Sequence, residues 1–99
     1  MASYVFTEKA ERDLETIVDY TVERWGTKHT IKYIESFEKV AQLLANNPEI
    51  GAKRDNLSVG LLSFPCQSHV LYYLKNAHGV SIVRILHSNT DPARHFQPE

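Results

Sequence analysis

Ninety-nine residues are enough for one domain with one modest hydrophobic core, and apolar residues make up 42% of the chain. The formal net charge of −1 disfavours a protein that contacts many phosphates of a nucleic acid, although a small local phosphate site needs no basic chain. No apolar run approaches membrane-spanning length, no apolar leader precedes the first predicted element, and the single cysteine, Cys66, cannot form an internal disulfide. We therefore expect a cytoplasmic protein without membrane contact, folded as a single domain over residues 1–99 with a short C-terminal tail at residues 88–99.

The charge is unevenly distributed along the chain. Residues 1–50 carry six lysines and arginines against nine acidic residues, whereas residues 51–99 carry five against three. Four of the five histidines also lie in the second half. This distribution favours a protein surface as the main partner, and we expect no strong direct binding of nucleic acid.

The beginning of the chain predicts a strand followed by an amphipathic helix. Residues 3–6 (SYVF) are short and apolar, as in a strand, and Thr7 then offers an N-cap hydroxyl to a helix that begins at Glu8. Apolar residues recur at helical spacing on one face as far as Trp25, and Gly26 is a natural C-terminal stop.

A second helix is predicted over residues 28–46, with Thr27 as its N-cap. Its apolar face is centred on Phe37 and Ala41, and the segment NNPEIG ends it because proline cannot continue a helix. The short link between the two helices predicts an antiparallel helix hairpin.

From residue 57 onward the apolar period is that of strands. Three runs, at residues 57–64, 69–74 and 80–87, are separated by the short turn segments PCQS and KNAHG, which predicts an antiparallel meander. The fold class is therefore α+β, a β-α-α-β-β-β two-layer sandwich. The antiparallel helix hairpin packs on one face of a small, mainly antiparallel sheet.

The last predicted strand carries two candidate site residues. Strict alternation places Ile82, Arg84 and Leu86 on one face of this strand, and Ile85 and His87 on the other. Arg84 then either pairs with a carboxylate or points to the uncovered face, where it contacts a partner or a phosphate. A site shared by Arg84 and His87 would need a bulge or a strand end near His87.

The tail after this strand has a local structural interpretation. Asp91 is a good N-cap and Pro92 is favoured at the first helical position, so one helical turn is predicted there. Phe96 is then either an anchor for the tail or an exposed aromatic offered to a partner.

The second half does not have the spacing of a metal site. Among its histidines and Cys66, the two residues Cys66 and His69 form the only pair close enough for a zinc clip, and no second clip follows. We expect no metal and no cofactor.

The first helix carries an acidic row that repeats every four residues: Glu11, Glu15, Asp19 and Glu23. This row is either a solvated helix face or a docking strip for a basic segment of another protein. Paired catalytic carboxylates would have to face each other across a cleft, which one helix surface does not provide.

The element order and three segments, TEKAERDLETIVDY, LLANNPEIG and IVRILHSNTDPARHF, resemble the ParE toxins of the RelE/ParE superfamily of bacterial type II toxin–antitoxin modules. The resemblance covers nearly the whole chain, and the final strand and tail are its most specific part. It implies a toxin that is neutralised by a ParD-like antitoxin, whose disordered C-terminal segment folds across the toxin's helices and sheet. It also implies that the toxin acts by binding and inhibiting DNA gyrase and not by catalysing a reaction.

For such a protein we assign target binding to the end of the chain and antitoxin binding to the acidic row and the open sheet face. The target-binding residues are Arg84, His87, Asp91, Arg94 and His95.

The alternative is the sister branch of RelE-like, ribosome-dependent mRNA endonucleases. Arg84 and His87 occupy positions that resemble those of a catalytic arginine and histidine in some of these nucleases. Ser88 stands where an aromatic hydroxyl commonly follows that histidine, and other basic residues are few. Both departures weigh against the nuclease, because phosphate cleavage needs an acid or base beside cationic side chains.

Overall fold

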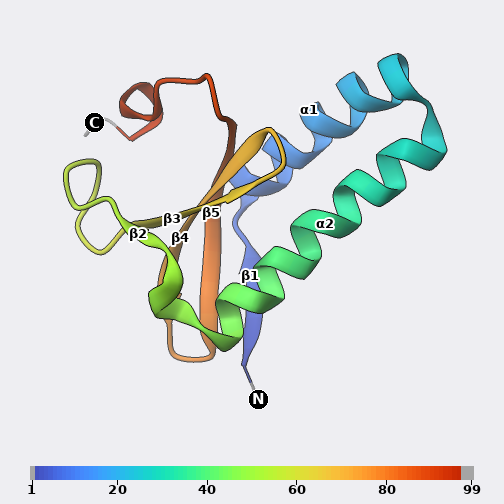
Figure 1. Cartoon of the computed structure of the whole chain (residues 1–99). Helices are drawn as coiled ribbons and strands as arrows, with labels where there is room; N and C mark the ends of the chain where they lie inside the picture. The colour runs from blue at the N-terminus through green and yellow to red at the C-terminus, as the bar shows by residue number, and fades with distance from the viewer. Residues whose placement is uncertain (1, 97–99) are drawn as a thin grey trace.

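Two helices cover one face of a five-stranded sheet in the computed structural model, which describes residues 2–96 (Figure 1). The elements in chain order are β1 (Ser3–Phe6), α1 (Glu8–Trp25), α2 (Thr27–Asn46), the 3₁₀ turn η1 (Pro48–Ile50), β2 (Ala52–Lys53), β3 (Leu62–Cys66), β4 (His69–Asn76), β5 (Gly79–His87) and the 3₁₀ turn η2 (Pro92–His95). The strand order is β1-β5-β4-β3-β2, with β1 parallel to β5 and the other neighbours antiparallel. The predicted α+β two-layer class is confirmed, and the two-residue β2 is an addition that the sequence pattern did not indicate.

The helix ends follow local capping with one exception. The hydroxyl of Thr7 accepts a hydrogen bond from the backbone N–H of Ala10 at 3.3 Å, as predicted for the N-cap of α1. The prediction of Thr27 as the cap of α2 is wrong, because α2 already begins at Thr27 and Gly26 is its N-cap. Gly26 is the only link between the helices, and its φ of 84° lies in the region that glycine enters at no steric cost.

The strand expected at residues 57–64 begins later, at Leu62. Residues 54–61 form a loop whose backbone groups bond to one another, with Arg54 N–H donating to the Leu61 carbonyl at 2.7 Å. The Asp55 carboxylate also accepts from Gly60 N–H at 3.0 Å. Because these backbone groups find partners locally, the apolar run in this stretch does not need the sheet.

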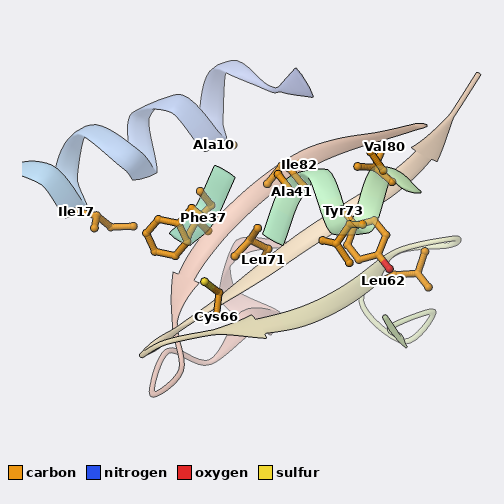
Figure 2. Close-up of a cluster of buried hydrophobic side chains, with 13 residues drawn as sticks. Ala10, Ile17, Phe37, Ala41, Leu62, Cys66, Leu71, Tyr73, Val80 and Ile82 are labelled. Carbon is orange, nitrogen blue, oxygen red and sulfur yellow. The ribbon is translucent and has the colours of Figure 1, made fainter. Parts of the chain in front are cut away.

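The main core lies between the helix pair and the sheet (Figure 2). Phe37 of α2 and Leu71 and Tyr73 of β4 are completely buried there. The phenol of Tyr73 donates to the Pro48 carbonyl at 2.8 Å and accepts from Gly51 N–H at 2.9 Å. Its polar end is therefore satisfied inside the core, which ties η1 to the sheet.

A smaller apolar cluster covers part of the other sheet face, which had been expected to be open. Leu61, Tyr72 and Leu86 are buried in it. Phe96 packs on Tyr72 with the ring centroids 5.2 Å apart, so Phe96 anchors the tail. In Figure 1 the tail and the 54–61 loop lie on the side of the sheet away from the helices.

A β-bulge in β5 changes which residues share a face. Tyr72 pairs with Arg84 and Tyr73 pairs with Ile82, so Val83 has no partner of its own in β4. As a result Ile82 and Ile85 both belong to the helix-side core, whereas Val83 and Leu86 both belong to the opposite cluster. The prediction of strict alternation along this strand is therefore wrong after Val83.

The end of β5 is held by α1 instead of by β1. The pairing of β1 with β5 stops at Phe6 and Ile82, so beyond Ile82 the edge of β5 that faces away from β4 has no strand beside it. The Thr7 hydroxyl donates to the Val83 carbonyl on this edge at 3.2 Å. The Asp13 carboxylate of α1 accepts from Ile85 N–H at 2.9 Å and from two nitrogens of Arg84 at 2.8 and 2.9 Å. The two side chains of this ion pair are only 15% and 17% exposed, so the pair is largely shielded from water.

Replacing Asp13 with alanine should destabilise the protein by about 3 kcal/mol, because it leaves the Arg84 charge and the Ile85 N–H without a partner. Urea unfolding followed by circular dichroism measures this change. The matched control is Asp19→Ala on the exposed side of the same helix, which should change stability by less than about 0.5 kcal/mol. Equal stabilities for the two variants would contradict the role assigned to Asp13.

Candidate functional site

A hollow of about 240 Å³ lies between α1 and the end of β5, and we call it the strand-end hollow. Its polar lining consists of Asp13, Thr16, His69, Arg84, His87, Thr90 and His95. The bulge at Val83 thus brings Arg84 and His87 to one site, although strict alternation would have separated them. His95 reaches the same site from η2 because the tail folds back beside the strand.

The other two predicted target-binding residues lie outside this hollow. The Asp91 carboxylate accepts from Ala93 N–H at 3.1 Å and caps η2, which confirms its predicted local role. Arg94 is exposed on the last turn of η2. The tail therefore presents Arg94 to solvent and His95 to the hollow.

Of the two alternatives for Arg84, the structure shows the pairing with a carboxylate. The hydrogen bonds that Arg84 donates to the Asp13 carboxylate raise the pKa of Arg84 further above its ordinary value, so the guanidinium stays charged. Most of that charge is offset by Asp13 at 2.8 Å.

A second hollow, of about 370 Å³, shares His69 and His87 with the first and lies at the tip of the helix hairpin. A series of rings lines it, which we call the aromatic ladder: Trp25, His29, Tyr33, His69 and His87. Successive ring centroids are 5.6, 6.4, 5.8 and 5.3 Å apart. This site was not predicted from the sequence, although the spacing of four residues between Trp25, His29 and Tyr33 places their rings on one side of the helix hairpin tip.

Trp25 does not lie in the core, although the helical spacing placed it on the apolar face of the first helix. Its side chain is 64% exposed and packs against His29. In Figure 1 the tip of the helix hairpin projects past the sheet, so the last turn of α1 has no strand beneath it.

Among the histidines of the ladder, His69 is partly buried, whereas His29 and His87 are exposed. Burial lowers the pKa of His69 first, and the neighbouring His87 lowers it further. Its Nδ1 atom and the Tyr33 hydroxyl are 2.8 Å apart and share a hydrogen bond. These contacts favour the neutral imidazole in the folded protein.

Stability should therefore fall as the pH drops from about 7.5 through the ordinary histidine pKa of about 6.5, because the unfolded chain then binds a proton that folded His69 resists. His69→Gln should flatten this dependence between pH 7.5 and 5.5, measured by urea unfolding at each pH. The control is His78→Gln at the exposed tip of the β4–β5 hairpin, which should leave the slope unchanged. A slope in His69→Gln equal to that of the parent chain would contradict the assignment.

A third hollow runs between the two helices on their outer side. This hairpin groove, of about 320 Å³, has an apolar floor that includes Val18, Val22, Ile31 and Ile34, and its rim carries Glu35 and Glu38. Ile31 is 55% exposed and Val22 is 39% exposed, so the floor is accessible.

The acidic row of α1 lies beside this groove for part of its length. Glu15 and Asp19 precede Val18 and Val22 by three residues each, which places them on neighbouring positions of the helix surface. Glu23 is rotated further away, by about 40° per four-residue step. All four acidic residues of the row are exposed. The groove therefore has carboxylates along both sides.

Within residues 2–96, no group of three or more histidine, cysteine or acidic residues is placed to hold a metal ion. Cys66 is buried in the helix-side core, where burial raises the pKa of its thiol. Over the same residues, neither helix is long and apolar enough to cross a membrane.

The comparison with protein families matches residues 4–92 to the family described as "ParE toxin of type II toxin-antitoxin system, parDE". The chain belongs to the ParE toxin family. It is 28% identical to Toxin ParE1 of Caulobacter vibrioides over 97% of this chain and 99% of that protein. It is 31% identical to Toxin ParE1 of Mycobacterium tuberculosis over 94% of this chain and 96% of that protein.

A solved structure shares the fold of this ParE family member. A chain from the chromosomal ParDE toxin–antitoxin system of P. aeruginosa superposes with a TM-score of 0.74 and 22% sequence identity. The match covers 88% of this chain and 96% of that chain. The family match and the shared fold confirm the resemblance noted in the sequence and the predicted architecture.

Proposed function

We propose that this ParE family member is a toxin that binds and inhibits DNA gyrase without catalysing a reaction, and that a ParD-like antitoxin neutralises it. Membership of the toxin family supports the first part. The observation that favours an inhibitor over a nuclease is the shielded pair of Asp13 and Arg84. An RNA-cleaving site would need cationic groups available for the transition-state phosphate, and here the arginine beside His87 is already neutralised.

The RelE-like nuclease remains the second candidate because of the bulge at Val83. The bulge places Arg84 and His87 at one hollow, which His95 of η2 also lines, as general acid–base chemistry on a phosphodiester would need. Two observations weigh against the nuclease. Burial lowers the pKa of His69 and so disfavours a positive charge on this ring. Ser88 also follows His87 in place of an aromatic hydroxyl. The strand-end hollow thus has the groups of a hydrolytic site without its free positive charge.

We assign target binding to the end of the molecule formed by His87, Arg94 and His95. His87 and Arg94 are exposed, and the locally capped turn that carries Arg94 has little backbone entropy to lose on binding. Asp91 contributes by holding the turn, and Arg84 by holding the strand end.

The purified chain should inhibit DNA supercoiling by gyrase and leave mRNA intact in a ribosome-programmed translation reaction. The variant Arg94→Ala should inhibit gyrase about tenfold more weakly, because a central arginine contact is typically worth this much. The exposed Arg12→Ala on α1 is the control and should inhibit like the parent chain. Ribosome-dependent mRNA cleavage with unimpaired gyrase would reject the inhibitor in favour of the nuclease.

For the antitoxin we propose the hairpin groove as the docking site. The apolar floor fits the apolar face of an amphipathic helix, and the carboxylates on both sides fit lysine and arginine flanking that face. The acidic row predicted for this role then contributes mainly through Glu15 and Asp19, which lie beside the groove.

Reversing the charge of Glu38 by Glu38→Lys should weaken binding of the cognate antitoxin about tenfold, mostly through a slower association rate at low salt. Glu23→Lys is a matched control on α1, because it reverses one exposed charge that is rotated away from the groove. Surface plasmon resonance at two salt concentrations measures both. Equal loss in the two variants would favour the acidic row as a whole over the groove.

A further inference from the structure

We propose that the strand-end hollow and the second hollow, lined by the aromatic ladder, together bind a nucleotide, with the base on the ladder and the phosphate beside His87 and His95. This inference does not depend on the gyrase proposal. The two hollows, of about 370 and 240 Å³, both have His69 and His87 in their linings, so they are adjacent, and a ligand that extends over these two rings would reach both. Their joint size falls in the range of small-molecule sites.

The second hollow has the surface that a planar base requires. Trp25 and Tyr20 are 64% and 59% exposed, and the rings of His29 and Tyr33 lie within 18° of parallel. The Arg24 guanidinium lies 5.0 Å from the centre of the Tyr20 ring, which adds a cationic plane at the rim. Aromatic and guanidinium planes of this kind stack on a base whatever its identity, so the site selects for a planar ring and not for a sequence.

The strand-end hollow has hydrogen-bond donors for a phosphate. The Nδ1 atom of His87 accepts from Asn89 N–H at 3.1 Å, so the proton of a neutral His87 sits on Nε2. That N–H, the hydroxyl of Thr90 and the ring of His95 surround one space. The Thr16 hydroxyl in the same lining already donates to the Arg12 carbonyl at 3.1 Å.

The charge around the two hollows permits an anion. Among the described residues that line them, Asp13 is the only carboxylate, and Arg84 and Ile85 N–H already bind it. Glu15 and Asp19 lie toward the hairpin groove, and none of the four residues of the acidic row belongs to the lining of either hollow. An anion entering these hollows therefore meets no unpaired carboxylate among the lining residues.

The number of cationic groups limits the ligand to a single nucleotide. Arg24 and Arg84 are the arginines of the lining, and no lysine belongs to it. Single-stranded nucleic acid is usually bound in a groove where cationic side chains follow successive phosphates. The site offers one base platform and one phosphate position, which is the chemistry of a nucleoside monophosphate.

Trp25 is the only tryptophan of the chain, so its fluorescence reports directly on the second hollow. Adenosine 5′-monophosphate should quench this fluorescence saturably, and calorimetry should give the same affinity. Adenosine alone should bind about tenfold more weakly, because it lacks the charge-assisted hydrogen bonds of the phosphate.

Two matched pairs of variants test the two halves of the site. His87→Gln should weaken binding of the monophosphate about tenfold and leave binding of adenosine unchanged, whereas His78→Gln, at the distant hairpin tip, should change neither. His29→Ala should weaken both ligands about tenfold through lost stacking, with Lys28→Ala as its control on the same helix turn. Circular dichroism confirms that each variant is folded.

Three outcomes would overturn the proposal. The first is the absence of saturable binding of the monophosphate. The second is equal affinity for adenosine and its monophosphate, which would remove the role of the strand-end hollow. The third is a single-stranded RNA that binds far more tightly than the monophosphate, which would make the site part of a nucleic-acid surface. Gyrase inhibition can succeed or fail independently of all three.

Discussion

The carboxylate of Asp13 joins the first helix to the last strand at the point where β1 stops pairing. This one carboxylate accepts hydrogen bonds from the Arg84 guanidinium and from Ile85 N–H, so it replaces a backbone hydrogen bond that a longer β1 would have made to β5. The position of α1 over the sheet depends on this contact, as does the direction of β5 after its bulge. His87 lines the strand-end hollow because the strand end is held in this way.

Helix α1 separates two surfaces of different chemistry. Toward α2 it carries carboxylates beside an apolar groove, which suits an amphipathic and basic protein segment. Toward the strand ends it carries Tyr20 and Arg24, which meet the histidines of β4 and β5. A neutraliser can therefore dock on the groove without covering the strand-end hollow, so a small ligand at the strand ends and a protein on the groove need not compete.

The Asp13–Arg84 pair is also the basis for the proposal that this toxin acts by binding and not as a nuclease. Arg84 and His87 occupy one hollow, as a phosphate-cleaving site requires, but the arginine is used to hold the architecture together. A charge committed to a shielded ion pair cannot also stabilise a transition state without breaking that pair. The same residue types in the same strand thus have a structural role here, and the histidines are left as the groups able to contact a ligand.

The sequence by itself determined the features that depend on a few neighbouring residues. Helical spacing, the Thr7 cap and the Gly26 link defined both helices, and the Asp91 cap defined the turn of the tail, because each of these bonds closes within four residues. The helix pair followed by strands was enough to give the fold class. Tertiary structure decided the bulge at Val83, since the register of a strand depends on its neighbour and not on its own period. It also decided the pairing of Asp13 with Arg84, 71 residues apart, and the aromatic ladder, whose rings come from four separate elements. These contacts form only once the elements pack, and their energies depend on burial that no local pattern records.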